Sequence, residues 1–175
     1  MRARFSTVVG LLLMVACQVP EVAPAPTPTA VHEPGPLEPS EPFGLTTVVL
    51  RPPDGGTAIS LHVYDAYEPK ARRRGLMHRE SLPPMTGMVF RMPEERAGGF
   101  WMKNTLIPLS IAFFDADGRV LAVRDMAPCE REPCPTYDPG AGYHGALEVN
   151  QGAFDEIGLE PGWHVDLPVG LPPPR

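Results

Sequence analysis

The sequence has little of what marks a membrane-spanning or nucleic-acid-binding protein. Its N-terminal apolar run, residues 5–16, is shorter than the roughly 20 residues that a transmembrane helix needs. Basic residues are in the minority, with 15 lysines and arginines against 21 aspartates and glutamates and a formal net charge of −6. This shortage of positive charge argues against nucleic acid as a partner.

The common catalytic motifs are also missing. The sequence holds no Gly-x-Ser-x-Gly elbow, no phosphate-binding P-loop, no His-Glu-x-x-His and no paired-carboxylate motif. We therefore expect no catalytic residue, no cofactor and no metal. The best remaining acid–base pair is His144 with Glu148, near Lys103, so a hydrolase or transferase stays open as an alternative function.

Methionine supplies a second alternative. Met77, Met85, Met88, Met92 and Met102 fall in one stretch, and thioethers are good ligands for copper(I). Methionine also fills irregular gaps in cores, and no Met-x-Met or His-Met doublet marks a ligand set here. We expect these residues to be core residues, with copper handling as the alternative.

The N-terminus has the pattern of an export signal. Arg2 and Arg4 precede the apolar run of residues 5–16. The run leads into the letters MVAC, residues 14–17, which resemble the lipobox of bacterial lipoproteins. In such signals the cysteine becomes the first mature residue and carries the lipid, so Cys17 is the expected acylation site, although a plain signal peptide remains an alternative. We expect a cell-envelope protein anchored to the membrane by lipid. Because Gln18 is not the aspartate that retains some lipoproteins at the inner membrane, the periplasmic face of the outer membrane is preferred.

A proline-rich segment follows the expected acylation site. Residues 18–44 hold eight of the 24 prolines and few bulky apolar residues, so they cannot bury enough surface to fold. The predicted organisation is a signal peptide over residues 1–16, a lipidated linker over 17–44, a monomeric globular domain over 45–170 and a tail over 171–175.

Only three cysteines are present, and two of them lie close together. Cys129 and Cys134 fall in a stretch of prolines, glycines and charges. In an exported protein this spacing favours a disulfide. A metal site with His144 and a redox-active pair are the alternatives, although zinc ligands more often occur as Cys-x-x-Cys.

Turn signals at short intervals predict a mainly β domain. Asp-Gly turns separate two pairs of apolar runs, residues 46–50 from 57–65 and residues 109–114 from 120–126. Alternation within the run 57–65 predicts that Tyr64 faces solvent. One helix is expected around the basic cluster before Gly75, which would act as its C-cap. The cluster consists of Lys70, Arg72, Arg73 and Arg74; cations suit a helix C-terminus, and an anion-binding patch is the alternative interpretation. Further strands are expected over residues 87–92, 99–102, 146–149 and 163–167, with a short helix over 151–157.

Three segments then point to a family. They are RGLMHRESLPPMTGMVFRM, FWMKNTLIPLSIAFFDADGRVLAV and HGALEVNQGAFDEIGLEPGWHV. They resemble the signature blocks of domain of unknown function 192, found in bacteria and archaea, and the resemblance extends over about residues 45–168. It implies a small β-rich domain, often exported or lipid-anchored, with no established activity. The expected fold is a single compact antiparallel sheet domain, barrel-like or sandwich-like, with one or two short helices.

The resemblance also suggests where a site would lie. The blocks that it aligns carry Arg74, Trp101, Lys103, Asn104 and Glu148, and we expect these side chains to meet at one rim. Such a rim would bind a small polar or anionic ligand, or an envelope protein, without catalysis. A structural role is the other interpretation of Asn104 and of Thr105, because asparagine tolerates the left-handed backbone of a turn and threonine can cap a bend through its side-chain hydroxyl.

Overall fold

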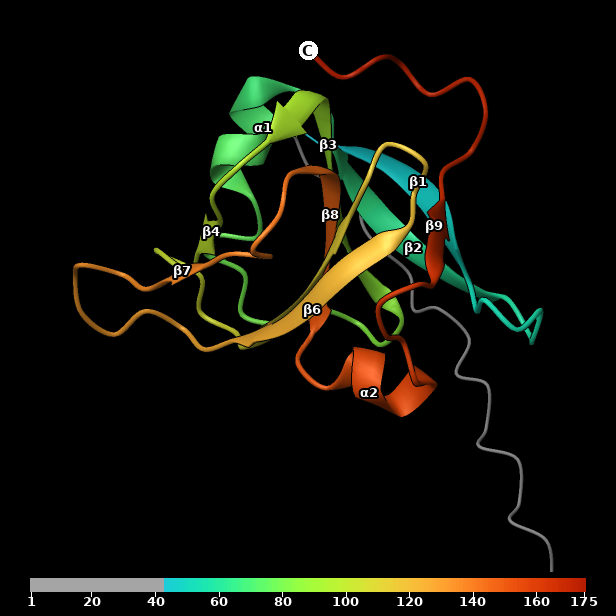
Figure 1. Cartoon of the computed structure of the whole chain (residues 1–175). Helices are drawn as coiled ribbons and strands as arrows, with labels where there is room; N and C mark the ends of the chain where they lie inside the picture. The colour runs from blue at the N-terminus through green and yellow to red at the C-terminus, as the bar shows by residue number, and fades with distance from the viewer. Residues whose placement is uncertain (1–42) are drawn as a thin grey trace, which may run out of the picture. The chain divides into compact units, whose positions relative to one another are not determined.

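The computed structural model describes residues 43–175 (Figure 1). The predicted signal peptide, Cys17 and nearly all of the linker lie outside these residues. No helix within residues 43–175 is both long and apolar enough to cross a membrane. The elements are β1 (Gly44–Arg51), β2 (Ile59–Ala66), α1 (Pro69–Arg74), β3 (Thr86–Arg96), β4 (Phe100–Trp101), β5 (Leu109–Phe114), β6 (Val120–Met126), β7 (Thr136–Tyr137), β8 (Tyr143–Asn150), α2 (Ala153–Ile157) and β9 (His164–Asp166).

Seven strands form the main sheet, in the order β6-β5-β8-β3-β2-β1-β9, and β4 pairs with β7 in a second, smaller sheet. The two hairpins predicted from their Asp-Gly turns, β1–β2 and β5–β6, are both present. Helix α1 ends at Gly75 as predicted, with a positive φ of 51° and an N–H that donates to the carbonyl of Ala71. The mainly β fold with two short helices is confirmed.

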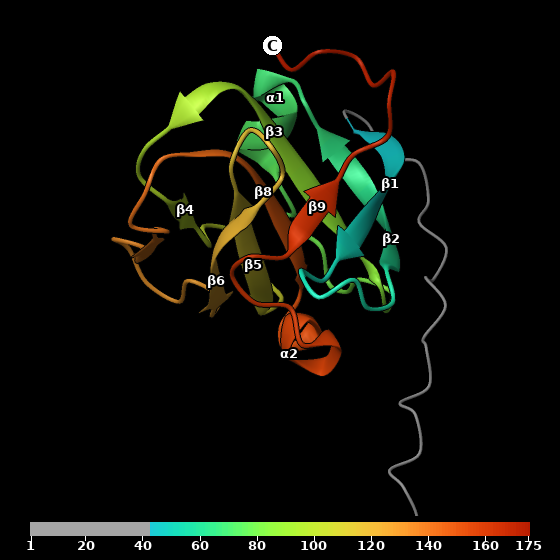
Figure 2. The ribbon, with the colours of Figure 1, turned by 45° about the vertical axis from the view of Figure 1, so that its right-hand side comes forward.

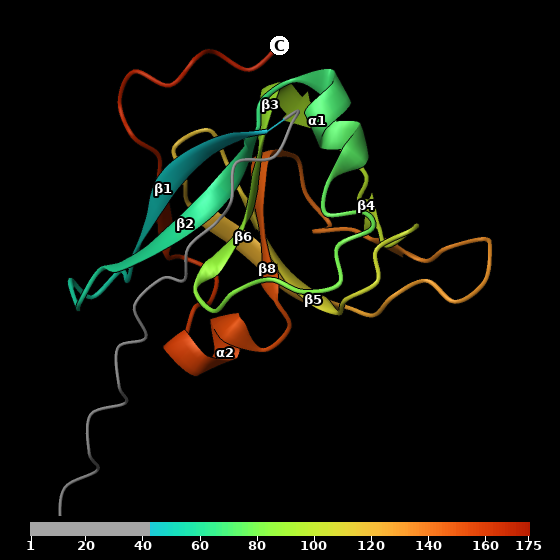
Figure 3. The same ribbon diagram turned by 180° about the vertical axis from the view of Figure 1, so that it is seen from behind.

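One pairing departs from the expected antiparallel sheet. Strands β2 and β3 run parallel, with Tyr64 opposite Met88. Parallel neighbours need a crossover connection, and residues 67–85, which include α1, provide it. The crossover places α1 over one face of the sheet (Figure 3).

The main sheet curls into a half-barrel whose two end strands approach each other (Figure 2). The Val120 N–H at the start of β6 donates to the Trp163 carbonyl at 2.7 Å, and the Val165 N–H in β9 donates to the Gly118 carbonyl at 2.8 Å. Glycine is needed at position 118, because φ is 86° and a Cβ there would lie 2.5 Å from the Val165 carbonyl oxygen. These contacts close the curl without a continuous ladder.

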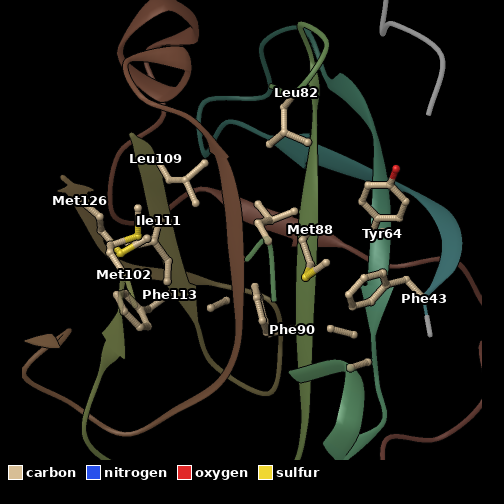
Figure 4. Close-up of a cluster of buried hydrophobic side chains, with 14 of the residues drawn as sticks. Phe43, Tyr64, Leu82, Met88, Phe90, Met102, Leu109, Ile111, Phe113 and Met126 are labelled. Atoms are coloured by element: carbon tan, nitrogen blue, oxygen red, sulfur yellow. The ribbon is translucent and has the colours of Figure 1, made fainter. Parts of the chain in front are cut away.

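Each face of the sheet carries its own buried cluster, because side chains alternate along the strands. Inside the curl, Val120 of β6 and Val165 of β9 contribute to one cluster, which Phe154 of α2 joins. The outer face carries the second cluster, shown in Figure 4. Its labelled members are Phe43, Tyr64, Leu82, Met88, Phe90, Met102, Leu109, Ile111, Phe113 and Met126.

Candidate functional site

A pocket of about 530 Å³ lies on the outer face, where α1 and the residues after it meet β3, β4 and β8. This volume falls in the range of about 300–1,000 Å³ that is usual for small-molecule sites. We call it the arginine pocket. Its polar and aromatic lining consists of Arg72, Arg73, Arg74, Phe90, Arg96, Phe100, Trp101, Thr105, Tyr143 and Glu148.

Four guanidinium groups line the arginine pocket, and they differ in their partners. Arg72 is held by backbone carbonyls, including those of Tyr67 at 2.6 Å and Arg91 at 2.9 Å. Arg73, Arg74 and Arg96 make no hydrogen bond or ion pair with any residue of the part that the structure describes. Burial lowers the pKa of Arg72, and the nearby positive charges of Arg96 and Arg73 lower it further. Arg73, Arg74 and Arg96 therefore bring positive charges together without a hydrogen-bonded or ion-paired acid in the part of the chain that the structure describes, whereas Arg72 also donates to the main-chain oxygen of Arg175.

Glu148 is the single acidic residue among those that line the pocket. It lies on β8 between Met88 of β3 and Ile111 of β5, and its side chain is only 5% exposed. No hydrogen bond or ion pair joins its carboxyl group to another residue of the range 43–175. Because no fully buried side-chain oxygen in that range lacks a partner, the carboxyl oxygens must reach the open space of the pocket. Burial raises its pKa to about 8, because desolvation penalises the ionised form. At neutral pH the carboxyl group is mainly protonated, so the lining carries positive charge only.

The structure brings three of the five predicted site residues together. Arg74, Trp101 and Glu148 line the arginine pocket, whereas Lys103 and Asn104 do not. Lys103 lies over the Trp101 ring, 5.6 Å from its centroid, and forms an ion pair with Glu132 at 2.5 Å. Asn104 occupies a left-handed turn with φ of 58°, as its structural interpretation requires.

Of the other charged residues of the pocket, Arg72 and Arg73 belong to the basic cluster for which an anion-binding patch was the alternative interpretation, and Arg96 was not predicted from the sequence. Arg96 lies opposite Tyr143 in the β3–β8 ladder, beyond a register shift that no local sequence signal reveals. Arg73 belongs to the basic cluster of α1, which the sequence explains as a helix C-terminus. The concentration of arginine before Gly75 is the sequence signal on which the alternative interpretation, an anion-binding patch, was based.

A disulfide-closed loop supports the outer wall of the pocket. The Cys129 and Cys134 sulfurs are 2.05 Å apart, which confirms the predicted bridge and leaves no free thiol there for a metal. The loop leads into β7, which pairs with Phe100 and Trp101 in β4. The two strands approach so closely that a Cβ on Gly99 would lie 2.1 Å from the Tyr137 carbonyl oxygen.

Within residues 43–175, the residues proposed for the two alternative functions, a hydrolase or transferase and copper handling, are not brought together in one site. His144 lines a different pocket, against β9 and the 115–118 turn, so it is not grouped with Glu148 or Lys103. Of the methionines, Met88 and Met102 are buried in the outer cluster, and Met77 and Met92 line the arginine pocket. Within residues 43–175, no three His, Cys, Asp or Glu side chains are placed to hold a metal ion.

Comparison with known proteins identifies the family. The profile described as "DUF192: Uncharacterized ACR" matches residues 50–167. The chain belongs to the DUF192 family. Among solved structures, this DUF192 chain is similar to a "putative transcription regulator" from Sinorhizobium meliloti 1021, with 30% identity, a TM-score of 0.65, and coverage of 71% of this chain and 95% of the other. It is also similar to a protein of unknown function from Novosphingobium aromaticivorans DSM 12444, with 27% identity, a TM-score of 0.64, and coverage of 81% and 99%. No curated protein matches it.

Proposed function

We propose that this DUF192 domain is a non-catalytic binding module that holds a small organic anion in the arginine pocket. One observation carries the proposal: Arg73, Arg74 and Arg96 line one pocket without a hydrogen bond or ion pair to any residue of the range 43–175, although the whole chain has a formal charge of −6. The single acid of the lining, Glu148, is buried, and its burial favours the neutral form. An anion would relieve the mutual repulsion of these guanidinium groups, and arginine binds carboxylate and phosphate through paired hydrogen bonds.

The shape and lining of the pocket support an organic anion over a bare inorganic one. Phe90, Phe100 and Trp101 supply aromatic wall, and Phe100 is fixed by edge contacts to Phe90 at 4.9 Å and to Phe113 at 5.7 Å between ring centroids. Such preformed aromatic surface binds the carbon skeleton of a ligand while a few polar groups orient it.

The test is to titrate the full chain with D-glucuronate and benzoate by isothermal titration calorimetry. The double substitution Arg74→Gln and Arg96→Gln should weaken binding of whichever anion binds by at least about 10-fold, since each charge-assisted hydrogen bond contributes about 1.5–3 kcal/mol. The matched control, Arg119→Gln with Arg124→Gln, removes the same charge from exposed positions outside the pocket. Equal weakening by both pairs would show only a general charge effect and would contradict the proposal.

We also propose that the domain is displayed in the cell envelope, on the periplasmic face of the outer membrane, by a lipid on Cys17. The MVAC sequence and the proline-rich linker support this placement. On expression in a bacterium, Cys17→Ser should move the protein from the membrane fraction to the soluble fraction, and mass spectrometry should show loss of the acylated N-terminal peptide. A wild-type chain that is unmodified and soluble would contradict lipid anchoring.

We infer that this chain does not share the regulatory role named for the Sinorhizobium protein. The net negative charge of the present chain gives no support for binding to the phosphate backbone of nucleic acid. We propose instead that its partners are the membrane and a small anionic ligand.

A further inference from the structure

Three largely buried residues present a hydroxyl or carboxyl group to the arginine pocket. Glu148, Tyr143 and Thr105 are 5%, 4% and 7% exposed. All three line the pocket, and no residue of the range 43–175 hydrogen-bonds their side-chain oxygens. Within residues 43–175 no fully buried side-chain oxygen lacks a partner, so these three groups open into the pocket and are available to a ligand. A few polar groups that converge on a cavity in this way orient the ligand that it binds.

The chemistry of these groups is uniform. A phenol and an aliphatic hydroxyl can each donate and accept a hydrogen bond, and a carboxyl group that burial keeps protonated at neutral pH can do the same. Burial likewise raises the pKa of Tyr143, so its hydroxyl stays protonated. Groups with this dual capacity match ligand hydroxyls, which also donate and accept. A ligand ammonium would instead favour an ionised carboxylate, and a purely apolar ring would leave all three groups unpaired.

We propose that the ligand of the arginine pocket is a polyhydroxylated anion, a sugar acid or sugar phosphate, whose hydroxyls bond to Glu148, Tyr143 and Thr105 and whose acidic group meets Arg73, Arg74 and Arg96. This rests on the proposed function and adds the ligand class. The aromatic walls at Phe100 and Trp101 suit the carbon–hydrogen face of a sugar ring.

The test compares four ligands on the full chain by isothermal titration calorimetry. D-Glucuronate and glucose 6-phosphate have both hydroxyls and charge, cyclohexanecarboxylate has the charge and a ring without hydroxyls, and glucose has the hydroxyls without charge. We expect glucuronate or glucose 6-phosphate to bind at least 10-fold more tightly than cyclohexanecarboxylate and glucose. Whichever of the two sugar anions binds more tightly shows whether the pocket prefers a carboxylate or a phosphate.

Substitutions that delete single hydroxyls give the second measurement. Tyr143→Phe and Thr105→Val keep the side-chain shape, and each should weaken the sugar anion about 5-fold, the effect of losing one hydrogen bond of about 1 kcal/mol, while leaving cyclohexanecarboxylate unchanged. If cyclohexanecarboxylate binds as tightly as the sugar anions, the ligand class is wrong and the anion-binding function stands. If glucose binds as tightly as glucuronate, or if no anion binds, both proposals fail.

Discussion

Replacing Arg91 with methionine is expected to lower the free energy of unfolding by about 3–5 kcal/mol, a large share of the stability of a small domain. Arg91 of β3 donates to both carboxylate oxygens of Asp65 in β2, at 2.8 and 2.7 Å, and the two residues are 7% and 3% exposed. Methionine would leave the Asp65 carboxylate buried without its counter-ion, which costs far more than the pair itself contributes.

Two further variants separate this explanation from a simple loss of packing. Adding Asp65→Asn to Arg91→Met removes the unpaired charge, so the double variant should recover part of the lost stability. Arg51→Met is the matched control, because the Arg51–Asp166 ion pair is largely exposed and should cost less than about 1 kcal/mol. Urea unfolding followed by circular dichroism measures all three. Equal losses for Arg91→Met and Arg51→Met would mean that burial of the pair does not matter.

The hairpins could be predicted because their signals are local. Asp-Gly sequences specify tight turns, so β1–β2 and β5–β6 follow from a few adjacent residues. The parallel β2–β3 pairing could not, since it depends on how a 19-residue crossover packs and not on any turn motif. For the same reason the prediction that Tyr64 faces solvent was wrong. Alternation identifies two faces, but a layer built by Phe43 and Leu82 buries the second one.

The candidate site could be predicted only in part, for residues within the segments that resemble the family and not for contacts that the fold creates. Arg74, Trp101 and Glu148 came from segments that resemble family blocks, and they do meet in one pocket. Tyr143 and Arg96 became neighbours only through the irregular end of the β3–β8 ladder. Lys103 also came from a segment that resembles a family block, but its ammonium forms an ion pair with Glu132 in the disulfide loop. Local sequence does not predict this contact, because the two residues lie about 30 positions apart.

Replacing Glu148 with glutamine is expected to remove most of the fall in the free energy of unfolding that burial of this carboxyl group causes between about pH 4.5 and pH 8. The pKa of Glu148 is about 8 in the folded protein against an ordinary value of 4.5. Below pH 4.5 the folded and unfolded chains both hold this proton. Between pH 4.5 and 8 only the folded chain holds it, so the free energy of unfolding falls by about 1.4 kcal/mol per pH unit. Above pH 8 both states release the proton, so the stabilisation that comes from holding it in the folded state is lost and the slope ends.

Urea denaturation of the wild type and Glu148→Gln at pH 5 and pH 9 measures the effect. The wild type should lose about 4 kcal/mol more than the variant across this interval, because glutamine cannot ionise and every other titrating group is common to both proteins. The variant should therefore be the more stable protein at pH 9 and close to the wild type at pH 5. Parallel stability curves would show that the Glu148 carboxyl is solvated or paired in solution. In that case the protein would have an ionised acid inside the arginine pocket, and an anionic ligand would meet repulsion from β8 as well as attraction from α1.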